Sequence, residues 1–161
     1  MTSLGSRLAT LRALSWPQRA ILLEAAVVLA ATTLAIRFLP FRLTIRLAEW
    51  PLGPERRRPP RDVLLRRVGW AVRVASRRVP WDAVCLHQGL TAQILLRRRG
   101  APSILYYGAN PGDAQGMKAH AWVECDGVDV VGGEAAAGYA VLAAFPRPAA
   151  AAGKLRRSGG T

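Results

Sequence analysis

One cysteine and one histidine are the residues of this chain best placed to do chemistry together. Cys85 stands in the first turn of residues 83–99, which are predicted to form a helix, and His120 stands in the predicted strand 118–125. A helix N-terminus and a neighbouring imidazole both favour the thiolate form of a cysteine, which is its nucleophilic form. The pair therefore predicts a thiol nucleophile at Cys85 with His120 as its base.

The expected start of the helix adds a second element to this site. Asp82 is the predicted N-cap, which leaves the backbone N–H groups around Cys85 without intrahelical partners. Such groups could line an oxyanion hole for acyl transfer. The alternative for Cys85 is a buried helical cysteine that behaves as a small apolar residue. For His120 the alternative is a satisfied histidine at a sheet edge.

The position of the third catalytic group follows from a predicted hairpin. Asp126–Gly127 is a strong two-residue turn between strands 118–125 and 128–131. The turn pairs Val123 with Val130, and continued pairing sets His120 opposite residues 132–133. Both of those residues are glycine, so no carboxylate stands where an orienting acid is expected.

Glu134 is the nearest carboxylate to that position, and its longer side chain could reach back to the imidazole. The predicted catalytic residues are therefore Cys85, His120 and Glu134. A two-residue site assisted by water or by a backbone carbonyl is the alternative that remains open.

A metal centre is the alternative to this thiol site. Cys85, His87, His120 and Cys125 make four side chains that could bind zinc. However, His120 and Cys125 are an odd number of residues apart on one strand and should point to opposite faces. No metal and no cofactor are therefore expected, and Cys125 is predicted to lie in the core. His87 is expected either to touch substrate or to lie on a solvated helix face.

Composition and charge bound the class of protein. The 161 residues are 51% apolar, enough for one packed domain or a small domain with a helical appendage. Two cysteines do not make a disulfide framework, so a reducing, cytoplasmic location is expected. The net charge of +13 belongs to residues 1–99, with 18 Lys and Arg against five Asp and Glu. Aromatic residues are too sparse for a single-strand stacking surface, so nucleic acid is not expected as a partner.

The chain is expected to fall into three parts. These are an N-terminal helical region with a Pro- and Arg-rich linker (1–60), a core (61–145) and a loosely held tail (146–161). Ser15 and Pro17 predict a helix start, and Pro40 predicts its end. Further expected elements are helices 41–50 and 61–78, strand 103–108, a loop 109–116, a C-terminal glycine stop at Gly100, and loose structure beyond Gly138.

The apolar run 20–36 leaves its environment open. It approaches the length that a bilayer requires, but it is slightly short, contains Glu24 and is rich in alanine. A buried helix or a helix at a membrane surface is therefore preferred to a transmembrane span. The expected location is therefore cytoplasmic, and contact with a membrane surface through residues 20–36 remains open.

Two segments of the chain resemble a known family. The pairing of CLHQGLTAQILLRRRGAPSILYYG (85–108) with KAHAWVECDGVDVVG (118–132) resembles the transglutaminase-like leader peptidase of lasso-peptide biosynthesis, and the similarity extends over residues 16–134. The resemblance implies an α+β fold, in which a nucleophile helix packs on a small antiparallel sheet beside an N-terminal helical region. It implies the nucleophile at Cys85 and the base at His120. The family's acid falls at about Gly132, where this chain departs from the pattern.

The resemblance also implies an activity and its partners. A cysteine protease of this kind removes the leader from a ribosomally made lasso-peptide precursor, and a separate ATP-dependent cyclase then acts on the freed core. The chain lacks room for a leader-recognition module, so a separate leader-recognition protein is expected. Two alternatives remain: a non-catalytic binding or scaffold module of the same fold, and an acyltransferase that uses the same thioester chemistry.

Overall fold

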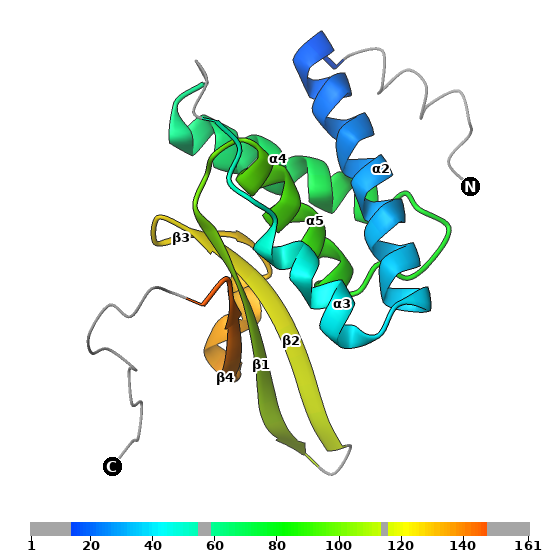
Figure 1. Cartoon of the computed structure of the whole chain (residues 1–161), viewed down its shortest axis with the longest axis vertical. Helices are drawn as coiled ribbons and strands as arrows, with labels where there is room; N and C mark the ends of the chain where they lie inside the picture. The colour runs from blue at the N-terminus through cyan, green and yellow to red at the C-terminus, as the bar shows by residue number, and fades with distance from the viewer. Residues whose placement is uncertain (1–13, 55–58, 114–115, 148–161) are drawn as a thin grey trace.

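The computed structural model of the chain describes residues 14–54, 59–113 and 116–147. Its helices gather against one side of a four-stranded antiparallel sheet with strand order β3-β2-β1-β4 (Figure 1). The predicted α+β class is therefore confirmed. In chain order the elements are α2 (Trp16–Phe38), α3 (Phe41–Arg46), the 3-10 turn η1 (Leu47–Glu49), α4 (Arg61–Ser76), α5 (Cys85–Arg98), β1 (Ser103–Asp113), β2 (Gly116–Cys125), β3 (Val128–Val131), the 3-10 segment η2 (Gly133–Gly138) and β4 (Ala140–Phe145).

The first long helix begins where local sequence signals predict. Ser15 is the N-cap of α2, its backbone N–H donates to Gln18 Oε1 at 2.9 Å, and Pro17 lies in the first turn. Pro40 ends the helix as expected. The next predicted helix, 41–50, keeps α-helical geometry only to Arg46 and finishes as the 3-10 turn η1.

Local hydrogen bonds define where α5 begins and where it ends. Its N-cap is Val84 rather than Asp82, and Asp82 is exposed outside the helix, so the capping prediction is wrong. The Gln88 side-chain amide instead donates to the Ala83 carbonyl at 2.8 Å and fixes the chain entering the helix. At the other end, Gly100 adopts a φ of +67° and donates to the Arg97 carbonyl at 2.9 Å, which confirms the predicted glycine stop.

The main core lies between α5 and one face of the sheet. Leu105, Ala121 and Val123 face α5 from β1 and β2 and are fully buried. A Cβ at Gly89 would lie 2.7 Å from Leu105 Cδ1, so this glycine allows the helix to approach the sheet closely. The helices α2 and α4 pack around α5, and their buried residues belong to the same apolar cluster as those of the sheet.

The helix α2 is attached to this core along one side. Its buried Thr32 hydroxyl lies 3.2 Å from the Thr91 hydroxyl of α5, and Glu24 forms ion pairs with Arg98 and Arg99. By length and composition alone, α2 is the one helix of the described residues that could cross a membrane. Its packing against α4 and α5 occupies one face of the helix within the protein.

The hairpin between β2 and β3 has the predicted turn but a different register. Cys125 pairs with Val128 as expected, but Val123 pairs with Val131 rather than Val130. A bulge inserts Val130 as an extra residue on β3. The register predicted for His120 is therefore shifted by one residue, because a bulge depends on packing that the turn sequence does not encode.

Two further expectations for the sheet are wrong. The predicted loop 109–116 is mostly strand, because β1 runs to Asp113 and β2 begins at Gly116. The chain beyond Gly138 is not all loose, because β4 pairs with β1 at the sheet edge, and the Phe145 carbonyl accepts a hydrogen bond from the buried Gln93 amide at 2.9 Å. Within the predicted tail and linker, residues 148–161 and 55–58 lie outside the described residues.

Candidate active site

Cys85 is the first residue of α5. Its side chain is half-buried and packs against the edge of the apolar core. No side chain caps this end of the helix, so the first-turn N–H groups are not occupied by a capping oxygen. The thiol makes no hydrogen bond to any residue that the structure describes. A nucleophile at this place has unpaired backbone donors beside it, as an oxyanion hole requires.

His120 is held on β2 by a backbone carbonyl and two aromatic rings. Its Nε2 lies 2.8 Å from the Gly132 carbonyl oxygen. Its ring centroid lies 5.0 Å from that of Tyr139 and 6.0 Å from that of Trp122. Because a carbonyl oxygen only accepts, Nε2 must carry the proton, which leaves the lone pair on Nδ1. The imidazole is therefore fixed in the tautomer whose Nδ1 can act as a base.

The structure does not join the thiol of Cys85 to the imidazole of His120 by a hydrogen bond. On β2, Ala121 and Val123 face α5, so His120 and Trp122 alternate to the other side of the strand. The pairing of β2 with β3 covers only Val123 to Cys125, so the part of β2 that precedes Val123, which includes His120, has a free edge on that side. Catalytic hydrogen bonds are often long or poorly aligned before substrate binds. The pairing of Cys85 with His120 therefore stays a prediction.

The two glycines that replace the expected acid each have a structural reason. Gly132 has a φ of +79°, and a Cβ there would lie 2.7 Å from the Ala121 carbonyl oxygen. A Cβ at Gly133 would lie 2.1 Å from a side-chain carbon of Asp129. Larger residues are therefore disfavoured at both positions in this conformation. The turn places a backbone carbonyl, rather than a carboxylate, against His120.

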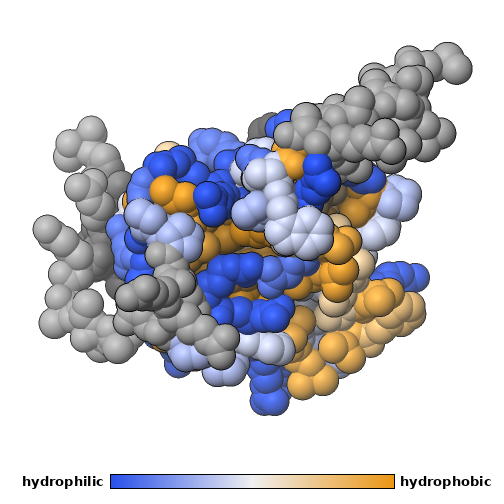
Figure 2. Space-filling view, turned by 90° about the horizontal axis from the view of Figure 1, so that it is seen from above, coloured by the Kyte–Doolittle hydropathy of each residue, from blue (hydrophilic) through white to orange (hydrophobic). Residues whose placement is uncertain are grey.

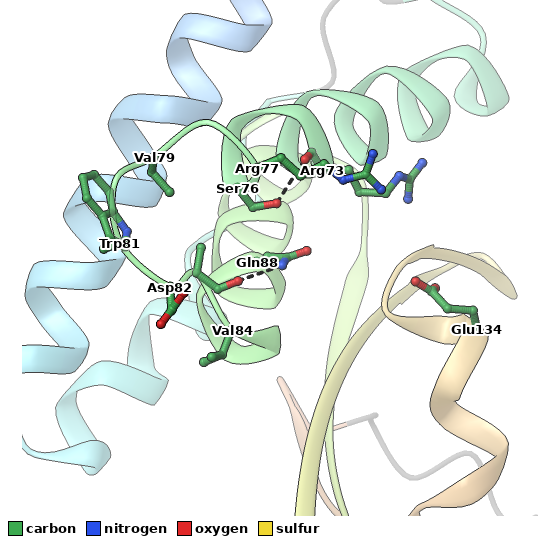
Figure 3. Close-up of a pocket in the computed structure, with 10 residues that line it drawn as sticks. Arg73, Ser76, Arg77, Val79, Trp81, Asp82, Val84, Gln88 and Glu134 are labelled. Carbon is green, nitrogen blue, oxygen red and sulfur yellow. Dashed lines mark hydrogen bonds between the residues drawn. The ribbon is translucent and has the colours of Figure 1, made fainter. Parts of the chain in front are cut away.

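Glu134 lies in the first turn of η2 and is exposed. It makes no hydrogen bond to His120, and it faces a cavity of about 620 Å³ between η2 and the start of α5 (Figure 3). The opposite side of this cavity carries Arg73 from α4 and Arg77, the C-cap residue that follows it. The structure therefore brings His120 to Gly132 and sets Glu134 at the rim of a partly basic cavity. A catalytic role for Glu134 stays a prediction.

His87 lies two residues after Cys85 and is half-buried, not on a fully solvated face. Burial lowers the pKa of the His87 imidazole below its ordinary value, and this outweighs the opposing effect of the nearby Val84 carbonyl. Its buried Nδ1 has no hydrogen-bond partner among the residues that the structure describes. Because residues two apart on a helix do not share a face, this imidazole is not placed as a partner of the Cys85 thiol.

Cys125 lies at the end of β2 and is 1% exposed, as expected for a core residue. Burial raises the pKa of the Cys125 thiol to about 11, and the adjacent Asp126 carboxylate acts in the same direction. The thiol is therefore protonated and shielded at neutral pH. Within the part of the chain that the structure describes, no three His, Cys, Asp or Glu side chains converge as metal ligands.

Sequence reasoning missed the contribution of Tyr139 to this site. The residue lies just after η2, in a segment predicted to be loose, and its ring packs on His120 because β4 anchors the chain that follows it. The sequence allows a backbone carbonyl as an alternative to Glu134 but does not identify Gly132 as its source. The paired glycines directly after a short strand were the signal that could have favoured it.

Comparisons with known proteins agree with this architecture. A family profile described as transglutaminase-like superfamily matches residues 25–144, which cover most of the helical layer, β1 to β3 and all of β4 except its last residue. Comparison with curated proteins and with solved structures gives no significant match.

Proposed function

The chain belongs to the transglutaminase-like superfamily, and from this premise we propose that it is a cysteine protease that removes the leader from a lasso-peptide precursor. Superfamily membership supports thioester chemistry, of the kind used by cysteine peptidases and acyltransferases. The resemblance of segments 85–108 and 118–132 to lasso leader peptidases supports the finer assignment. The observation that carries the proposal is an imidazole held through Nε2 by Gly132, in a fold whose nucleophile helix begins uncapped at Cys85.

The mechanism uses groups of this chain alone. The mechanism requires the His120 side chain, which β2 turns away from α5, to reach Cys85 around the free edge of β2 when substrate binds. In that arrangement Nδ1 of His120 takes the thiol proton, and Cys85 Sγ attacks the scissile carbonyl carbon. The first-turn N–H groups of α5 stabilise the negative oxygen of the tetrahedral intermediate. His120 then gives its proton to the amine of the core peptide, which leaves. Water, activated by His120, releases the leader from its thioester with Cys85.

In this proposal the Gly132 carbonyl replaces the missing acid in one of its two roles. It orients the ring and fixes the tautomer, as a carboxylate would. Unlike a carboxylate, it adds no full negative charge to stabilise the imidazolium that forms. The proposal therefore predicts an active enzyme with a less strongly stabilised ion pair. Glu134 is the carboxylate that could supply that charge if the η2 segment moves when substrate binds.

Positive charge on the helices supports an acidic peptide as substrate or partner. Exposed arginines, among them Arg66 and Arg67, follow α4 to its C-cap. Two further ones, Arg73 and Arg77, line the cavity at the start of α5. Such a surface attracts acidic peptides in a salt-dependent manner. Affinity for the leader, or for its separate recognition protein, should fall as salt rises; an affinity insensitive to salt would remove this part of the proposal.

The decisive experiment is a cleavage assay with the precursor peptide and the leader-recognition protein. The wild type should release an intact leader, detected by mass spectrometry. Cys85→Ala should abolish release, while Cys125→Ala, the matched control at the other cysteine, should retain it. Cleavage that survives Cys85→Ala contradicts the mechanism. Unchanged cleavage in Glu134→Gln removes Glu134 from the catalytic group.

Two other functions are separated by the same assay. A non-catalytic binding module is favoured by the lack of a carboxylate against His120; it would bind the precursor without cleaving it in the presence of every partner, including the ATP-dependent cyclase. An acyltransferase would join the leader to an added amine. Hydrolysis in water enriched in heavy oxygen should place one heavy oxygen on the new leader carboxylate, which an aminolysis product lacks.

A further inference from the structure

The outer face of α2 is a continuous apolar stripe. Trp16, Leu23, Val27, Leu34 and Phe38 follow one another at intervals of seven and four residues, which places them on one side of an α-helix. Their side chains are between 58% and 78% exposed. Figure 2 shows apolar residues gathered on one flank of the molecule, the flank on which α2 and α3 lie in Figure 1.

This stripe is distinct from the face that holds α2 to the protein. The inner face carries Ile21, Ala25 and Leu29, which are buried in the shared core. Exposed apolar residues continue past the helix onto α3, at Phe41 and Leu43. The apolar surface is thus larger than scattered exposed residues would make, and surfaces of this kind mark interaction sites.

The charges around the stripe indicate what can cover it. Arg19 and Arg37 are 18 residues apart on α2, which is five turns, so they flank the stripe on the same side at its two ends. Arg42 and Arg46 add exposed positive charge on α3. The one carboxylate of α2, Glu24, is held by Arg98 and Arg99. An apolar surface bordered by arginine fits an anionic lipid surface.

A second copy of the chain fits less well. It would bring its own net charge of +13 against the same positive border, and like charges repel. A membrane-spanning position also conflicts with the packing. Crossing the bilayer would separate α2 from α4 and α5 and break the buried contact between Thr32 and Thr91.

We propose that α2 docks the protein on an anionic membrane surface, lying in the plane of the interface with its outer stripe inserted. The aromatic residues at its ends, Trp16 and Phe38, suit the boundary between head groups and acyl chains. The inner face of α2 keeps its contacts with α4 and α5 throughout. This inference stands on the surface of α2 and does not depend on the activity of the thiol site.

The test is sedimentation of the full chain with vesicles, either pure phosphatidylcholine or one part phosphatidylglycerol to three parts phosphatidylcholine. The wild type should bind the anionic vesicles and release as salt rises. The double variant Leu23→Glu with Val27→Glu should bind the anionic vesicles with a partition coefficient at least about tenfold lower than that of the wild type. The matched control is Val141→Glu with Leu142→Glu, which alters equally exposed apolar residues on β4 and should bind as the wild type does.

Several results would overturn the proposal. They are failure of the folded wild type to bind anionic vesicles, equal binding by the stripe variant and the β4 control, and resistance to extraction at alkaline pH, which would indicate a spanning helix. A stable dimer in light scattering that only the stripe variant dissociates, without vesicle binding, would assign the face to a second copy. Circular dichroism and thermal unfolding must show that both double variants fold. If the first stripe variant does not fold, a second one, Leu34→Gln with Phe38→Gln, takes its place.

Discussion

The two cysteines of this protein occupy opposite kinds of environment, although both lie at the end of a regular element. Cys85 opens α5, is half-buried and has unpaired backbone donors around it. Cys125 closes β2, is buried against the core and has a carboxylate as its neighbour. Thiol chemistry requires access and donors, and only the first environment supplies them. From these surroundings we expect Cys85 to be the reactive thiol and Cys125 to be a structural one, although both lie at the end of a regular element.

The largest effect expected from this comparison concerns turnover. Cys85→Ala should lower the rate of leader release by about 10⁴-fold or more, because no other group of the site can form the thioester. Cys125→Ala should leave the rate close to that of the wild type and lower the thermal midpoint instead, because it removes a buried sulfur. Rates from mass spectrometry and midpoints from calorimetry provide the check; the reverse pattern would exchange the roles of the two thiols.

The next effect concerns alkylation. The raised pKa of Cys125, about 11, leaves a thiolate fraction on the order of 10⁻³ at pH 8, and burial slows its reaction further. Iodoacetamide should therefore modify Cys85 in the folded protein and spare Cys125 until the chain is unfolded. Peptide mapping after timed labelling measures both rates. Equal labelling rates of the two cysteines in the folded protein would contradict the claim that Cys125 is shielded and Cys85 accessible.

Substitution at Gly132 should affect the Cys85 site and spare the labelling of Cys125. Gly132→Ala forces a side chain into a left-handed backbone conformation and against the Ala121 carbonyl, so unfolding free energy should fall by about 1–3 kcal/mol. Because the Gly132 carbonyl then moves relative to His120, kcat should fall while KM changes little. Gly127→Ala is the matched control, since it also has a positive φ but has open space around it. An equal loss of kcat in both variants would mean that the effect is only one of stability.

The smallest effect concerns acid stability near Cys85. Because the pKa of His87 is lowered in the folded state, the unfolded chain binds a proton more readily, and stability should decrease as pH falls below the ordinary histidine value of about 6.5. His87→Gln should therefore show a smaller drop in thermal midpoint between pH 7.5 and pH 5 than the wild type. A larger drop in the variant would reverse the sign assigned to His87.

Short-range signals in the sequence predicted much of the framework. Ser15, Gly100 and the Asp126–Gly127 turn act within a few residues, and the structure has a helix start, a helix stop and a turn at those places. The bulge at Val130 and the strand β4 could not be predicted in this way, because each depends on pairing with distant segments.

The candidate site also has features that local sequence predicts and features that depend on distant segments. The types and spacing of Cys85 and His120 indicate their chemistry, and their placement on α5 and β2 follows from local patterns. The partner of His120 is a backbone oxygen, which every residue carries and which no side-chain type reveals. The outer stripe of α2 was visible only as an apolar run, because sequence alone cannot say which face the core will cover.

The central claim is that Cys85 carries the leader as a thioester and that His120 is the general base and acid of the reaction. The most direct measurement is to treat the folded protein, with its recognition partner, with a leader peptide ending in a vinyl sulfone, and to map the modified residue by mass spectrometry. The account predicts one leader attached to Cys85 in the wild type and none in Cys85→Ala, with slower attachment in His120→Gln. Attachment to Cys125, or a rate unchanged in His120→Gln, would contradict it.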